Sequence, residues 1–133
     1  MSDRTWRILL VEDDRFLRKA AETTLKRHGY AVVTANDGEE ALRAARSELP
    51  DLVLLDLIMP KLNGFEVLRA LKGEASTAPI PVVVLSNLGQ DHDVQQALAD
   101  GAMAYLVKAD LSLQELVKRV GQFLSANGTH GNG

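Results

Sequence analysis

The chain has 133 residues, the size of one domain, and a chain of this length buries roughly two thirds of its unfolded surface in a single core. Its 15 basic and 18 acidic residues give a formal net charge of -3, with no basic run or base-stacking aromatic cluster, which argues against direct nucleic-acid binding. The absence of cysteine excludes disulfides and zinc-thiolate sites. There is no signal-peptide pattern and no apolar run of the roughly 20 residues that cross a bilayer, so we expect a soluble, cytoplasmic protein without membrane contact.

Five apolar runs rich in leucine or β-branched residues alternate with five segments of helical period, the pattern of βαβ units around a parallel sheet. The expected strands are residues 7–12, 31–35, 51–56, 80–86 and 103–108. The third and fourth runs are apolar throughout, as is typical of strands covered on both faces. The sequence therefore predicts an α/β fold: a flavodoxin-like, doubly wound, five-stranded parallel sheet in the order 2-1-3-4-5, with five helices on both faces.

Local start and stop signals place the first three helices. Asp14 is a good N-cap for the first helix, which ends at His28-Gly29. Asp37-Gly38 opens the second helix and Asn63-Gly64 the third. Each carries apolar residues at spacings of three and four, so one face of each helix packs on the sheet.

The last two helices differ in their packing signals. The fourth, from about Asp91 to Asp100, has a narrow apolar stripe, so we expect it to move at low cost. The fifth begins with the capping box Ser112-Leu113-Gln114-Glu115, and its apolar positions continue to Leu124. The small, polar, Gly-rich residues after it cannot offset the entropy of ordering. The expected division is an N-terminal extension 1–6, a domain 7–124 and a flexible tail 125–133.

Acidic residues follow two of the apolar runs. Glu12, Asp13 and Asp14 come after the first run, and Asp56 ends the third. In the expected strand order these runs are neighbours, so at least three carboxylates converge at one sheet edge, where their repulsion demands a proton or a cation. Hard oxygen ligands without His or Cys nearby favour magnesium or manganese. The sequence predicts a divalent-metal site there, with Asp14 in a helix-capping role.

Two more polar residues end the neighbouring strands, Ser86 the fourth and Lys108 the fifth. A hydroxyl and an ammonium beside Asp56 can both bind phosphoryl oxygens. An ionised aspartate is also a nucleophile that can form an acyl phosphate while a metal neutralises the phosphoryl charge. Asp56, on the central strand, is the best placed nucleophile for phosphoryl transfer.

These residues together resemble a response-regulator receiver domain of bacterial two-component signalling, similar to the stand-alone chemotaxis regulators. The resemblance runs from about Arg7 to Leu124. It rests on the acidic pair after the first strand, Asp56-Leu57-Ile58-Met59-Pro60, Asn63-Gly64, Ser86 and Lys108, in the family's order and spacing. It implies a phosphoprotein of a phosphorelay rather than an enzyme with a separate substrate, catalysing at most its own phosphorylation and slow dephosphorylation.

The resemblance also implies roles for individual residues. Asp56 is the phosphoacceptor for a histidine kinase or a histidine phosphotransfer protein. The metal, Mg²⁺ or Mn²⁺, is held by Glu12, Asp13 and Asp56 with the backbone carbonyl of Ile58. Of the acidic pair, Asp13 is the expected direct ligand and Glu12 is expected to act through water.

The switch implied by the resemblance consists of Ser86, Lys108 and Tyr105. In similar domains the hydroxyl moves toward the phosphoryl group and the aromatic residue turns inward. This remodels the face made by the fourth helix, the fifth strand and the fifth helix, and so changes binding to a downstream protein, as a monomer or as a phosphorylation-dependent dimer.

Two local features of this chain differ from or qualify the family pattern. Lys108 is followed by Ala109 instead of the usual cis proline, and a cis bond before a residue other than proline costs about 2.5 to 4 kcal/mol, so we expect a trans peptide. The apolar residues Ile58 and Leu88 stand where polar side chains otherwise orient a hydrolytic water. We therefore hypothesise slow self-dephosphorylation.

Other function classes fit less well. A flavin-binding flavodoxin needs a phosphate-cradling loop after the first strand, where this chain has three acids. An aspartyl-phosphate phosphatase places a second Asp two residues after the first, where this chain has Ile58. The alternative that stays open is a receiver-like interaction module that does not use phosphorylation.

Overall fold

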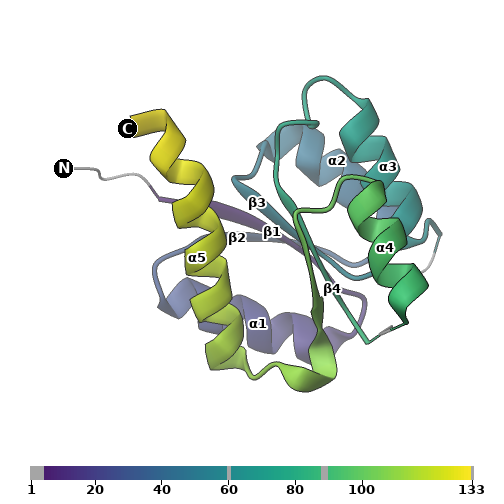
Figure 1. Ribbon diagram of the computed structural model, residues 1–133. Coiled ribbons are helices and arrows are strands. Elements are labelled where there is room, and N and C mark those ends of the chain that lie inside the picture. The colour runs from purple at the N-terminus through teal and green to yellow at the C-terminus, as the bar shows by residue number, and fades with distance from the viewer. Residues whose placement is uncertain (1–4, 60, 88–89, 133) are drawn as a thin grey trace.

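The computed structural model describes residues 5–59, 61–87 and 90–132, with side chains up to residue 126 (Figure 1). The strands are β1 Arg7–Val11, β2 Ala31–Ala35, β3 Leu52–Leu55, β4 Val82–Ser86 and β5 Ala104–Val107. The helices are α1 Arg15–Arg27, α2 Gly38–Glu48, α3 Gly64–Gly73, α4 Asp91–Ala99 and α5 Leu113–Asn132, with a short 3-10 helix, η1, at Lys108–Asp110.

All neighbouring strands are parallel, and the sheet order is β2-β1-β3-β4-β5, which confirms the predicted flavodoxin-like arrangement. Val11 of β1 lies opposite Leu55 of β3. The residues that follow this pair are Glu12 and Asp56, so the register brings the two acidic positions side by side at the carboxyl edge.

The helices cover the sheet on both faces. Helices α1 and α5 lie on one face, and α2, α3 and α4 lie on the other (Figure 1). Every residue of β3 and β4 is buried, as the apolar runs predict. The middle of the sheet is therefore apolar and buried, and the polar side chains that could bind a ligand lie at its carboxyl edge.

Side chains cap the helices that border this edge. The Asp14 carboxylate accepts hydrogen bonds from the backbone N–H groups of Phe16, at 2.9 Å, and Leu17, at 3.1 Å. The predicted capping box of α5 is also present, because Ser112 Oγ accepts from the Glu115 N–H and the Glu115 carboxylate accepts from the Ser112 N–H. In contrast, α4, whose residues are all described, buries a single residue, Ala97, so its small packing area is as expected.

Helix α5 is longer than the sequence analysis expects. It continues through Asn132, so the segment expected as a flexible tail from Ser125 onward is helical up to that residue. The capped and packed first turns explain the extension, because adding a residue to an existing helix needs no new nucleation. Although α5 has 20 residues, no helix in the described chain is apolar enough to cross a membrane.

The segment after β3 is held by a close backbone approach. The N–H of Gly64, the first residue of α3, donates to the Leu57 carbonyl at 2.8 Å. A methyl group on Gly64 would lie 2.5 Å from the backbone carbonyl oxygen of Asp56. Since backbone cannot rotate away as a side chain does, glycine at this position sets how α3 packs beneath the acidic edge.

We expect Gly64→Ala to lower the free energy of unfolding by about 3 kcal/mol, because overpacking against backbone forces a shift. Urea denaturation measures the loss. Gly73→Ala is the matched control at the other end of α3, where a methyl group meets open space, and it should raise stability by up to about 1 kcal/mol. Equal stability of Gly64→Ala and the wild type would contradict the role of this close approach.

Candidate functional site

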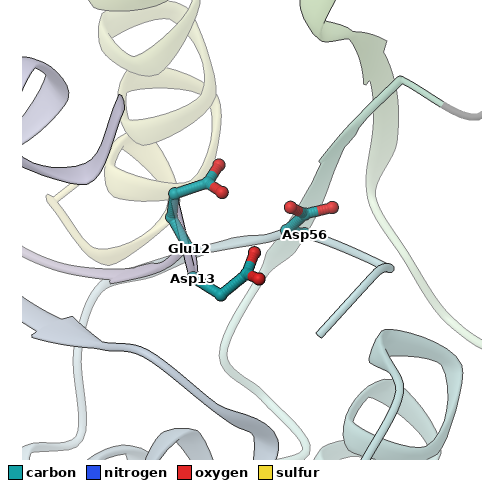
Figure 2. Close-up of side chains that lie close together, drawn as sticks. All are labelled: Glu12, Asp13 and Asp56. Atoms are coloured by element: carbon teal, nitrogen blue, oxygen red, sulfur yellow. The ribbon is translucent and has the colours of Figure 1, made fainter. Parts of the chain in front are cut away.

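Three carboxylates meet at the carboxyl edge of the sheet. Glu12 and Asp13 follow β1 and face Asp56, which follows β3 (Figure 2). Glu12 and Asp56 are 5% and 6% exposed, whereas Asp13 is exposed. Each residue offers one oxygen within 4.8 Å of the others. The convergence that the strand order predicts is therefore present.

The Asp56 carboxylate is held by one donor on each oxygen. Oδ1 accepts from the backbone N–H of Ile58 at 3.1 Å, and Oδ2 accepts from Lys108 Nζ at 2.9 Å. Lys108 has a side-chain exposure of 14%, so this contact lies largely out of water. The carboxylate is thus oriented from its own loop and from the end of β5.

Lys108 is shared between two carboxylates, because its ammonium also forms an ion pair with Glu12 Oε1. The other oxygen of Glu12 accepts from the Asp14 N–H at 3.1 Å. Burial raises the pKa of Glu12, although Lys108 and the Asp14 N–H oppose the shift. Burial acts to lower the pKa of Lys108, but its bonds to Glu12 and Asp56 outweigh burial and the net shift is upward.

The donor set fits a divalent cation. Three carboxyl groups face a single ammonium, and carboxylate oxygens are the ligands that Mg²⁺ and Mn²⁺ prefer. The three carboxylate oxygens within 4.8 Å of one another could hold such a cation directly or through its bound waters. Asp13 is the exposed member of the three, whereas Glu12 and Asp56 are buried and both contact Lys108.

An open pocket of about 330 Å³ lies in front of the carboxylates. This volume is many times the ~30 Å³ share of one water molecule, so the pocket has room for small polar groups in front of the carboxylates. The lining residues are Glu12, Asp13, Asp14, Leu17, Asp56, Ile58, Asn87 and Lys108. Ile58 borders it and is 57% exposed, while Leu88 lies outside the described residues.

Ser86 and Tyr105 form a pair on the neighbouring strands β4 and β5, next to β3. Ser86, at the end of β4, is fully buried, and Tyr105, on β5, is half-buried against the core beneath α2, α3 and α4. Burial raises the pKa of the Tyr105 phenol, and a hydrogen bond with Ser86 partly offsets this shift. Two of the three residues that the resemblance assigns to the switch, Ser86 and Tyr105, are therefore in contact.

The loop after Lys108 takes a different path from the one that a cis proline would set. None of the peptide bonds in the described ranges is cis, as expected for Lys108-Ala109. Residues Lys108–Asp110 form the turn η1, which is closed by a 3.1 Å bond from the Leu111 N–H to the Lys108 carbonyl. Lys108 nevertheless reaches both acids.

Two residues near the site were missed by the sequence analysis. Asn87 lines the pocket immediately after Ser86. Arg18, on α1, donates from Nη1 to the carbonyl oxygens of Glu12, at 2.9 Å, and Asp13, at 3.4 Å. A cation four residues after an N-cap and close to an acidic loop is the signal that points to Arg18, because side chains on a helix lean toward its N-terminus.

We expect Lys108→Met to lower the free energy of unfolding in metal-free buffer by about 3 kcal/mol, because it leaves two buried carboxylates without their cation. Chemical denaturation in the presence of a chelator measures this. Lys61→Met is the matched control, since its 56% exposed side chain pairs with Asp37 and Glu39 at 3.5 and 3.6 Å. Exposed pairs contribute at most about 1 kcal/mol, so equal losses in the two variants would refute the special role of Lys108.

Comparison with known proteins relates this arrangement to a family. The model of the response regulator receiver domain matches residues 8–121. The gliding motility regulatory protein of Myxococcus xanthus is 40% identical over 114 residues, which cover 86% of this chain and 15% of that protein. Protein PilH of Pseudomonas aeruginosa is 38% identical over 102 residues, covering 77% of this chain and 84% of PilH.

A solved structure agrees with these matches. The chemotaxis protein CheY4 of Vibrio cholerae superposes with a TM-score of 0.83 at 30% identity, covering 90% of this chain and 98% of that one. The chain spans a small part of the gliding motility protein, so the activity of that longer protein is not carried over. The family match includes both acidic strand ends, the lysine after β5 and the first turns of α5, and the chain belongs to the response regulator receiver domain family.

Proposed function

We propose that this receiver domain accepts a phosphoryl group on Asp56 from a histidine kinase or a histidine phosphotransfer protein, with Mg²⁺ or Mn²⁺ bound, and thereby changes its affinity for a downstream protein. The observation that carries the proposal is the environment of Asp56. Its carboxylate is oriented by Lys108 and the Ile58 N–H, and it borders a pocket that Glu12 and Asp13 also line.

The chemistry follows from these contacts. A carboxylate oxygen of Asp56 forms a bond to phosphorus while the N–P bond of a phosphohistidine donor breaks, and the electron pair of that bond returns to the imidazole nitrogen. A bound Mg²⁺ supplies positive charge to the phosphoryl oxygens. Lys108 is a second cation for them, because its ammonium already contacts the attacking carboxylate. The proposed metal ligands are Asp56, Glu12, Asp13 and the backbone carbonyl of Ile58.

The proposed output is a change on the face made by α4, β5 and α5. Ser86 and Tyr105 connect the site to this face, since Ser86 ends the strand beside β5 and Tyr105 lies on β5. Helix α4 buries Ala97 alone among its residues, and Leu98 and Met103 are 46% and 39% exposed nearby. Exposed apolar side chains on a weakly packed helix and just after it suit a switchable protein contact. We propose that this occurs in the cytoplasm, with a histidine kinase or phosphotransfer protein upstream.

Incubation of the purified chain with acetyl phosphate and Mg²⁺ should add one phosphoryl group, because acetyl phosphate is an acyl phosphate like the proposed product and needs no kinase. Intact-protein mass spectrometry detects the gain. The gain should disappear with a chelator and in Asp56→Asn, which removes the nucleophilic charge at nearly constant shape.

The matched control for this experiment is Asp51→Asn, which changes an aspartate on the approach to β3, away from the acidic edge, and should leave the gain intact. A protein that is folded, binds metal and still takes up no phosphate would favour the alternative function, an interaction module that does not use phosphorylation. A gain that persists in Asp56→Asn would show that another residue is the acceptor.

We expect phosphorylated protein to lose its phosphate slowly, and Ile58→Asn to speed the loss, because a polar side chain at the pocket rim can orient the attacking water. Release of inorganic phosphate from the isolated phosphoprotein gives the rate. The hypothesis would be wrong if the wild-type half-life were seconds and Ile58→Asn left it unchanged. Ile58→Leu is the control that keeps the pocket apolar.

A further inference from the structure

Arg18 lies on α1, a helix that contributes no proposed metal ligand, and it contacts the loop that carries Glu12 and Asp13. Its Nη1 donates to the Glu12 carbonyl at 2.9 Å and lies 3.4 Å from the Asp13 carbonyl. The side chain is half-buried, and the bond to Glu12 is partly shielded from water. Hydrogen bonds from a guanidinium are charge-assisted and stronger than neutral ones.

The start of α1 explains how Arg18 reaches this loop. Asp14 caps the helix, and the N–H of Arg18 closes the first turn on the Asp14 carbonyl at 2.9 Å. Side chains on a helix lean back over the preceding turn. The guanidinium of Arg18 therefore lies over the segment that joins β1 to α1, where the carbonyls of Glu12 and Asp13 are still outside the helix.

These bonds hold the backbone on both sides of the metal-ligand positions. The Glu12 N–H donates to the Ala35 carbonyl of β2 at 3.0 Å, and the Glu12 carboxylate accepts from the Asp14 N–H. Arg18 adds the contacts to the two carbonyls. The peptide planes between Glu12 and Asp14 are thereby oriented, and with them the direction in which the exposed Asp13 side chain points.

We propose that Arg18 is a positioning residue for the divalent cation: it orients Glu12 and Asp13 through their backbone carbonyls and so raises the affinity for Mg²⁺. This inference rests on the proposed function in so far as that function places the cation at Glu12, Asp13 and Asp56. Residues that orient metal ligands without touching the metal typically change affinity by about 10- to 100-fold.

The sign of the effect separates positioning from simple electrostatics. Arg18 carries a positive charge beside a cation site, so by charge alone its removal would strengthen cation binding. By positioning, its removal weakens binding, because the carbonyls lose their donor and the loop gains freedom. The two explanations predict opposite changes for one substitution.

The experiment is a Mn²⁺ titration of the full chain followed by electron paramagnetic resonance, with Mg²⁺ competition giving the Mg²⁺ affinity. We expect Arg18→Gln to weaken binding about tenfold, the lower end for residues that orient ligands. Arg15→Gln is the control: it removes the same charge from an exposed residue of the same helix turn, and affinity should stay within about twofold of the wild type or rise slightly. Arg18→Lys, which keeps the charge and one donor group, should fall between the wild type and Arg18→Gln.

Several outcomes would overturn the inference. If folded Arg18→Gln binds the metal as tightly as the wild type or more tightly, positioning is excluded while the metal site stands. If Arg15→Gln weakens binding as much as Arg18→Gln does, positioning by Arg18 is excluded as well. A wild-type chain without saturable Mn²⁺ binding would overturn this inference and the metal requirement of the proposed function together. Thermal unfolding without metal tests whether each variant is folded. If Arg18→Gln is not folded, Arg18→Lys decides: weaker binding than the wild type supports positioning, and equal or tighter binding refutes it.

Discussion

Repulsion between carboxylates at the carboxyl edge of the sheet is the constraint on which the site depends. Parallel pairing of β1 with β3 places Glu12 and Asp56 next to each other, and burial weakens the screening of their charges. Lys108 offsets part of this repulsion by contacting both residues. Three carboxyl groups thus face one ammonium, and the adjacent open pocket leaves room for a further cation.

The surrounding loops hold these charged side chains in place by backbone contacts rather than by the packing of large side chains. Gly64 lets α3 approach the carbonyl of Asp56, and Asp14 both caps α1 and donates its N–H to Glu12. The site is thus built on stiff connections between buried strands and capped helices. Helix α4 is the exception, since Ala97 is its one buried residue. Stability is therefore unevenly distributed, with the least-packed helix on the face proposed for output.

The sequence predicted the strands, their order and the meeting of the acids, because apolar period and the rules of parallel crossovers determine which strand ends are neighbours. It predicted the caps at Asp14 and Ser112, because those signals are local. It did not predict that Arg18 contacts backbone carbonyls, because a cation four residues after the N-cap Asp14 is a weak signal that does not name the acceptor. The length of α5 was also underestimated, because composition describes the cost of ordering a segment but not its attachment to an existing helix.

The position of Lys108 shows why side-chain geometry at this site needed the structure. Its loop lacks the family's proline and forms the turn η1, yet the ammonium lies between Glu12 and Asp56. A long, flexible side chain can compensate for a changed backbone path when two buried carboxylates attract its charge. The ammonium is therefore placed by its partners as much as by its loop. If Lys108 turns toward a phosphoryl group on Asp56, its bond to Glu12 must weaken, which would couple the end of β5 to the acidic loop after β1.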